Sequence, residues 1–124
     1  MDMMSQMMRH DHEITRYGSS GFTVAGVRYD SALLLTSTHI STFESVGAFD
    51  LVSIRAIVEP LPQKPEILLL GTGHTHQFIA PSIRHAVKLE YGIALDSMDT
   101  GAACRTFNLL LSEGRSVGAI LLPY

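Results

Sequence analysis

The chain has 124 residues, an apolar fraction of 46% and a charged fraction of 17%. These values are typical of one compact domain with a core of its own, and they exclude a disordered chain. The formal net charge is −3, and the nine lysines and arginines are scattered singly. The sequence therefore has no electrostatic footprint for nucleic acid.

The first 13 residues are predicted to form a flexible tail, followed by one α/β domain over residues 14–124. The tail is rich in methionine and lacks the apolar core of a signal peptide. Its His10 and His12 lack a third ligand nearby, so no metal site is expected there. No stretch approaches the roughly 20 apolar residues of a membrane span. The single cysteine, Cys104, suits a reducing compartment. We expect a soluble, cytoplasmic protein without membrane insertion.

The first half of the domain predicts β-structure. Apolar and polar residues alternate over 22–24 and again over 27–29, with Ala25-Gly26 as the turn of a hairpin. Residues 32–35 form an apolar run that is typical of a buried strand. The segment 36–47 is ambiguous between helix and strand, because apolar residues at threefold spacing stand among β-branched ones.

The rest of the chain predicts helices and strands in alternation. A short helix is expected over 50–58, with Asp50 as its N-cap and Pro60 as its stop. A βαβαβ unit with parallel strands follows. Its predicted elements are a strand at 67–70, a helix at 82–91 after Pro81, a strand at 93–95, a helix from Asp99 to about Glu113 and a strand at 117–122.

Two polar loops are expected to meet at one edge of this sheet, residues 71–76 and residues 97–101. Open α/β sheets bind ligands beyond the carboxyl ends of parallel strands, so this rim is the first place to look for function. Gly71 and Gly73 resemble the start of a dinucleotide fingerprint, but His76 replaces the third glycine and the next helix begins too late. The glycines are better explained by a tight turn leaving the sheet.

His74 and His76 are two residues apart and could begin a metal site, but a catalytic zinc needs a third protein ligand that the sequence does not supply. Asp99 and Thr100 could orient a substrate, although both residues are also common at a helix start. Arg105 and Asn108 lie on the polar face of their helix and could form a recognition surface. Each of these residues also has an ordinary structural explanation as a cap or a solvated side chain.

Two further side chains need an explanation. Cys104 shares an apolar helical arc with Phe107 and Leu111, so it is predicted to be buried and unreactive rather than a nucleophile. A catalytic cysteine would also need His74 or His76 as its base. Glu90 falls within the apolar arc of its helix, but its place in the last turn lets it bend toward water.

Four blocks of the second half are similar to those of a known family: residues 65–73, 98–100, 103–108 and 112–115. The chain resembles, over roughly 17–123, the small domain shared by archaeal and bacterial proteins of unknown function, a vertebrate adipogenesis-associated protein and a mitochondrial assembly factor for respiratory complex I. Phe43 departs from the tryptophan expected at that position. The resemblance implies a layered α/β fold around a mixed sheet, no established enzyme activity, and a chaperone-like role in building a membrane complex.

Two functions are therefore predicted. The first is a non-enzymatic interaction domain, an assembly or accessory factor with an unidentified protein partner and with homo-oligomers allowed. The alternative is a small-molecule-binding protein or weak enzyme that uses the rim. Neither hypothesis assigns a catalytic residue, a metal or a cofactor. The candidate partner- or ligand-binding residues are Gly71, Gly73, His74, His76, Asp99, Thr100, Arg105 and Asn108.

Overall fold

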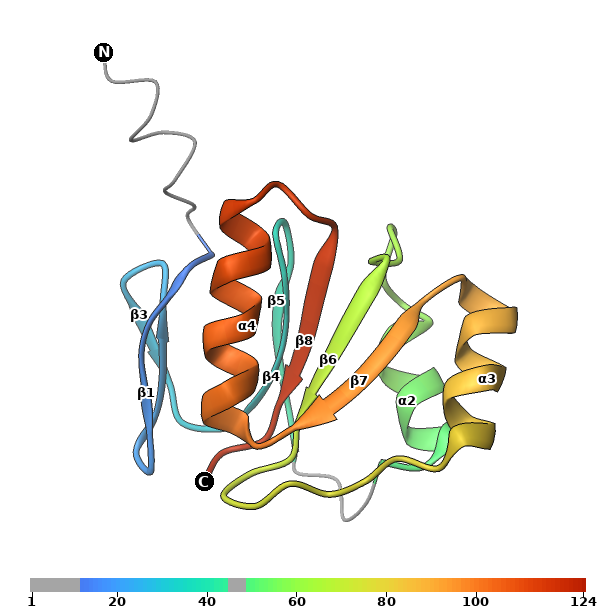
Figure 1. Cartoon of the computed structure of the whole chain (residues 1–124). Coiled ribbons are helices and arrows are strands. Elements are labelled where there is room, and N and C mark those ends of the chain that lie inside the picture. Colours follow the sequence, from blue (N-terminus) through green and yellow to red (C-terminus); the bar gives the residue numbers. More distant parts are fainter. Residues whose placement is uncertain (1–11, 45–48) are drawn as a thin grey trace.

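The computed structural model describes residues 12–44 and 49–124, which form two sheets and three helices (Figure 1). The predicted tail lies outside the described residues, apart from His12 and Glu13. In chain order the elements are β1 (Ile14–Gly18), β2 (Gly21–Val24), β3 (Val27–Tyr29), β4 (Ala32–Thr36), β5 (Ile40–Phe43), α2 (Leu51–Val58), β6 (Ile67–Gly71), α3 (Pro81–Tyr91), β7 (Ala94–Met98), α4 (Thr100–Ser112) and β8 (Val117–Leu121).

The larger sheet has five strands in the order β5-β4-β8-β6-β7. β6 lies between β7 and β8 and is parallel to both, which confirms the predicted βαβαβ unit. β4 runs antiparallel to β8 and to β5, so the sheet is mixed, as the family resemblance implied. The remaining strands form an antiparallel sheet in the order β1-β2-β3.

Both faces of the five-stranded sheet are covered (Figure 1). α4 and the three-stranded sheet cover one face, where Leu33, Leu35 and Phe107 share a buried cluster. α2 and α3 cover the other face, where Leu34 packs with Val87 in a second cluster. Successive residues of β4 thus enter opposite cores, and burial on both faces explains its unbroken apolar sequence.

The helix boundaries follow the predicted capping residues. Asp50 accepts a hydrogen bond from the backbone N–H of Ser53 (2.8 Å) and starts α2. Pro81 is the first residue of α3, and Gly92 ends that helix with a left-handed φ of 72°. Asp99 accepts from the N–H of Ala102 (2.9 Å) and starts α4.

Three expectations need correction or completion. β1 was not predicted, because only Ile14 of its five residues is buried. The ambiguous segment contains a strand, β5, while residues 45–48 lie outside the described part of the chain. β7 begins one residue later than predicted and continues to Met98. The predicted loop 97–101 is therefore wrong: only Asp99 connects strand and helix.

Within the described ranges 12–44 and 49–124, no helix has both the length and the apolar character needed to cross a membrane.

Candidate functional site

The carboxyl ends of β6, β7 and β8 meet at one edge of the sheet, the lower edge in Figure 1. The antiparallel pairing of β4 with β8 brings Leu33 opposite Leu121, so β4 begins at the same edge. β5 ends there too, because Ala32 pairs with Phe43. The rim expected from the sequence therefore exists, and five strands contribute to it.

The buried Thr100 connects two neighbouring segments of this rim by hydrogen bonds. Its Oγ1 accepts a hydrogen bond from the N–H of Gly73 (2.8 Å) and donates one to the carbonyl oxygen of Leu122 (2.6 Å). Its own N–H donates to the carbonyl oxygen of Gly73 (2.9 Å). A Cβ added at Gly71 would lie 3.1 Å from the Cα of Thr100, so glycine permits this close approach. Gly71, Gly73 and Thr100 are all buried.

The two rim histidines are exposed, and they have different partners. His76 Nε2 lies 3.0 Å from Ser97 Oγ, within hydrogen-bond distance. The ring of His74 packs edge-on against Tyr124, with 5.7 Å between the ring centroids. Among the described residues, no group of three or more histidine, cysteine, aspartate or glutamate side chains is placed to hold a metal ion.

A polar cluster lies over the first turn of α4. Tyr124 Oη occupies the space that a side chain at Gly101 would need, and a Cβ there would lie 3.3 Å from Arg105 Nη1 and 3.4 Å from Asp99 Oδ1. Arg105 Nη1 donates a hydrogen bond to Tyr17 Oη (2.9 Å), which raises the pKa of Arg105. Burial, followed by the Asp99 charge, raises the pKa of Tyr124. Because Asp99 is the helix cap, it competes with any anion for the backbone N–H groups.

The side chain of Asn108 is used within the fold. Its Oδ1 accepts from the N–H of Ile14 (2.8 Å) and its Nδ2 donates to the carbonyl oxygen of Ile14 (2.8 Å).

Cys104 is fully buried, as predicted, and this burial raises the pKa of its thiol to about 12. Glu90, the acidic residue in the apolar arc, is exposed and forms an ion pair with Arg55 of α2 (2.8 Å).

Phe78 is a surface residue that sequence reasoning missed. Its side chain is 87% exposed, and its ring lies tilted against that of His76, with centroids 4.6 Å apart. It stands in the segment between β6 and α3, where no periodic pattern separates exposed from buried apolar residues. An aromatic ring held in water at the rim is a candidate contact for a partner.

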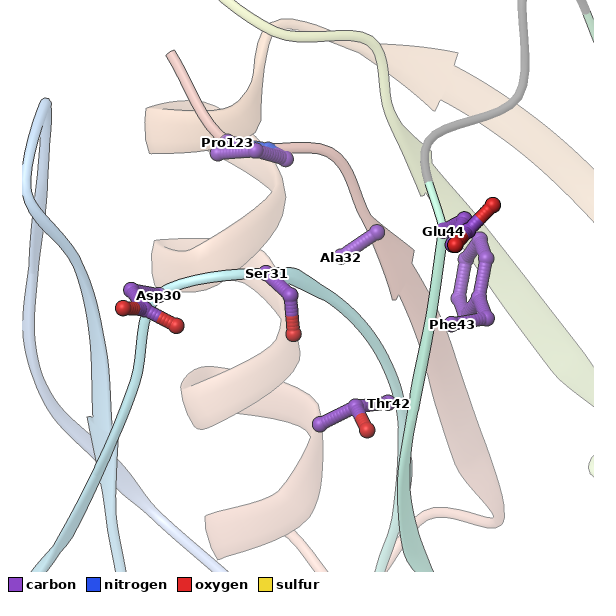
Figure 2. A pocket seen from close by; sticks show the side chains of 7 residues that line it. All are labelled: Asp30, Ser31, Ala32, Thr42, Phe43, Glu44 and Pro123. Atoms are coloured by element: carbon purple, nitrogen blue, oxygen red, sulfur yellow. The ribbon is translucent and has the colours of Figure 1, made fainter.

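A pocket of about 550 Å³ lies beside the rim (Figure 2). Asp30, Ala32, Phe43 and Glu44 line it together with Pro123, so its wall mixes carboxylates with apolar groups. Pro123 connects the pocket to the rim, because a Cβ added at Gly73 would lie 3.5 Å from its carbonyl oxygen. The pocket is a candidate ligand site.

A family model described as "Protein of unknown function (DUF498/DUF598)" matches residues 14–122. The chain is 35% identical over 116 residues to NADH dehydrogenase (ubiquinone) 1 alpha subcomplex assembly factor 3 of Mus musculus, which covers 89% of this chain and 60% of the mouse protein. It is 34% identical over 111 residues to an uncharacterized protein of Rhodobacter capsulatus, which covers 89% of this chain and 83% of that protein.

The fold also occurs among solved structures. A crystal structure of a protein from Bordetella parapertussis matches with a TM-score of 0.78 at 28% sequence identity, covering 94% of this chain and 98% of the other. The family model thus covers nearly all the residues that the structure describes. This chain spans only 60% of the length of the mouse relative.

Proposed function

The chain belongs to the family described as "Protein of unknown function (DUF498/DUF598)", and from this premise we propose that it is a non-enzymatic interaction domain that serves as an assembly or accessory factor for a protein complex. NADH dehydrogenase is the first complex to test, because a relative 35% identical to this chain is named as one of its assembly factors. The proposal includes the expected cytoplasmic location, which cell fractionation checks.

The exposure of Phe78 is the observation that carries this proposal. A phenylalanine in water forgoes about 1.5–3 kcal/mol of burial free energy, and aromatic residues are enriched where proteins bind each other. Phe78 lies next to His76 at the rim, while His74 and Arg105 are exposed nearby on the loop and on α4. These four side chains are the proposed contacts. Gly71, Gly73, Thr100 and Asn108 support the contact surface from inside the fold.

A gene deletion with complementation tests the proposal. We expect cells without this protein to contain less assembled NADH dehydrogenase on native gels, and wild-type protein to restore it. Phe78→Ala should restore it poorly, because truncating a residue that dominates an interface costs about 2 kcal/mol or more of binding, roughly thirtyfold in affinity. The matched control is Leu89→Ala, since Leu89 is also largely exposed (73%) but lies near the end of α3, away from the rim. An unchanged complex in the deletion strain would overturn the choice of complex.

The pocket beside the rim favours a second candidate, a small-molecule-binding protein. Its volume of about 550 Å³ is within the range of ligand sites, and its two carboxylates, Asp30 and Glu44, favour a ligand with a cationic group. Thermal-shift screening with amines tests it. A shift that Asp30→Asn abolishes would support a ligand-binding role, whereas no shift for any compound would remove it.

A further inference from the structure

Three arginines lie on the side of the molecule formed by the small sheet and α4: Arg16 and Arg28 on the sheet and Arg105 on α4. In the small sheet, Thr23 pairs with Arg16 of β1 on one side and with Arg28 of β3 on the other. Residues directly opposite each other point to the same face of a sheet. The neighbours of Thr23 in β2, Phe22 and Val24, are buried in the core. Arg16 and Arg28 therefore share the outer face of this sheet.

A pocket of about 390 Å³ lies at these arginines. It is lined by Thr15, Arg16, Tyr17, Ser20, Gly21 and Arg28. Arg28 Nη2 donates a hydrogen bond to the carbonyl oxygen of Ser20, which holds the guanidinium against the β1–β2 turn. Gly21 has a φ of 116°, and the carbonyl oxygen of Tyr29 lies where its side chain would be. Glycine is therefore required at this position of the turn, where β2 meets β3 closely.

Tyr17 is paired with the buried Phe22, so its side chain lies on the opposite side of β1 from Arg16, toward α4, where its hydroxyl accepts the hydrogen bond from Arg105. β1 is an edge strand, so the positive surface continues around this edge from the outer face of the small sheet to α4. We call Arg16, Tyr17, Arg28 and Arg105 the arginine surface. In the part of the chain that the structure describes, the ion pairs involve other arginines, Arg55 and Arg84, so the three positive charges are not neutralised by an ion pair.

The arginine surface differs in sign from the molecule as a whole, whose net charge is −3. The carboxylates nearest in sequence are Glu13, which precedes β1, and Asp30, which follows β3 and whose side chain lines the pocket beside the rim. Asp99 acts on Arg105 from the helix cap. These acids lie at the borders of the surface, while Arg16 and Arg28 lie on either side of the uncharged Thr23.

We propose that the arginine surface binds an extended, acidic segment of a partner protein. Arg16 and Arg28 are two strand spacings apart, about 10 Å at the backbone. In the extended polyproline II conformation, carboxylates three residues apart lie on the same side of the chain, and a rise of about 3.1 Å per residue separates them by about the same distance. Arginine binds carboxylates with two parallel hydrogen bonds, and Arg and Tyr dominate interface binding energy. The inference rests on the proposed function in expecting a protein partner.

Fluorescence anisotropy with the full chain tests the proposal. The probe is a labelled peptide with glutamate at every third position, and its glutamine counterpart is the reference. We expect saturable binding of the glutamate peptide that weakens between about 25 and about 200 mM salt, since screening lengths fall over that range. The double variant Arg16→Glu/Arg28→Glu should bind at least about tenfold more weakly, and Arg105→Glu about fivefold.

Arg115→Glu is the matched control for Arg105→Glu, because Arg115 is exposed in the connection after α4 and its substitution makes the same change in net charge. Equal weakening by Arg115→Glu would mean a bulk charge effect and would overturn the proposal. Arg16→Gln, which removes the positive charge without adding a negative one, covers the case in which the double variant does not fold.

Competition identifies the source of the negative charge. Inorganic phosphate, phosphatidylserine vesicles or duplex DNA that binds in an Arg16- and Arg28-dependent way, without binding of the glutamate peptide, would overturn the proposal. If the wild-type protein restores the complex in cells but does not bind the glutamate peptide, only this inference is contradicted. If the protein binds the glutamate peptide but deletion of its gene leaves NADH dehydrogenase unchanged, only the proposed choice of complex is contradicted.

Discussion

Cys104 shows how burial controls side-chain chemistry in this fold. It lies in the first half of α4, where the helix dipole lowers a thiol pKa, yet desolvation raises the pKa to about 12 against an ordinary value of 9.0. The nearby Arg105 lowers the pKa and is the weaker influence. The side chain therefore behaves as a small apolar residue, as its position on the apolar arc predicted.

We predict that native protein resists thiol reagents at neutral pH and is labelled only when unfolded. Cys104→Ala should cost about 1 kcal/mol of unfolding free energy. Because the thiol pKa is raised on folding, its contribution to stability is complete below pH 9 and is lost as the pH rises toward 12. Urea titrations across this range should show a smaller alkaline loss in Cys104→Ala. Rapid labelling of the folded protein would revive the nucleophile hypothesis.

The rim residues divide into two groups that the sequence could not separate. Thr100 and Asn108 are polar residues on α4, like Arg105, but Thr100 is buried against Gly73 and Asn108 bonds to β1. Their partners lie far away in the sequence, so helical periodicity alone cannot reveal them. Phe78 was missed for the opposite reason, because an apolar residue outside a periodic segment gives no sign of its exposure.

β1 depends on a helix that follows it by about 90 residues. Its five residues contain one buried side chain, Ile14, and the strand is held by pairing with β2 and by the Asn108 amide. The sequence therefore gave no β signal at this position. Apart from β5 and the end of β7, the other strands of the described chain were predictable from apolar runs or alternation, and glycines and caps made the helix ends predictable.

We predict that Asn108→Ala releases β1 from α4. Two hydrogen bonds to Ile14 are lost, each worth about 0.5–1.5 kcal/mol, so a total loss of about 2 kcal/mol of unfolding free energy is expected. Hydrogen exchange should accelerate at Ile14 more than in β6 of the central sheet. Asn108→Asp keeps the acceptor for the Ile14 N–H but places a carboxylate oxygen against the Ile14 carbonyl oxygen, so it should lose at least as much stability as alanine. Equal exchange rates in all three proteins would contradict this role.

β7 illustrates why the second rim loop was predicted wrongly. Asp96 and Ser97 are polar, so the pattern ended the strand at residue 95, yet both pair with β6. β7 is an edge strand, which tolerates an exposed Asp96, and Arg84 forms an ion pair with that aspartate (3.4 Å). The buried Ser97 finds its partner in His76. Polar residues with tertiary partners thus concealed the end of the strand.

At the scale of the whole molecule, the rim has buried residues that are hydrogen-bonded to each other and exposed side chains around them. Thr100 closes β6, α4 and the segment after β8 into one unit, and the surrounding side chains Phe78, His74 and Arg105 face outward. The arginine surface continues from Arg105 onto the small sheet. These exposed side chains support the proposed role as an interaction domain.

Site-specific photo-crosslinking in living cells tests that role most directly. A photoreactive phenylalanine analogue replaces Phe78 in one variant and Leu89 in a matched one, both of which retain the wild-type fold by circular dichroism. We predict crosslinks from position 78 to a subunit or assembly intermediate of NADH dehydrogenase, and none from position 89. Crosslinks that are equal at both positions, or no crosslink from position 78 in cells that are assembling the complex, would contradict the proposed role.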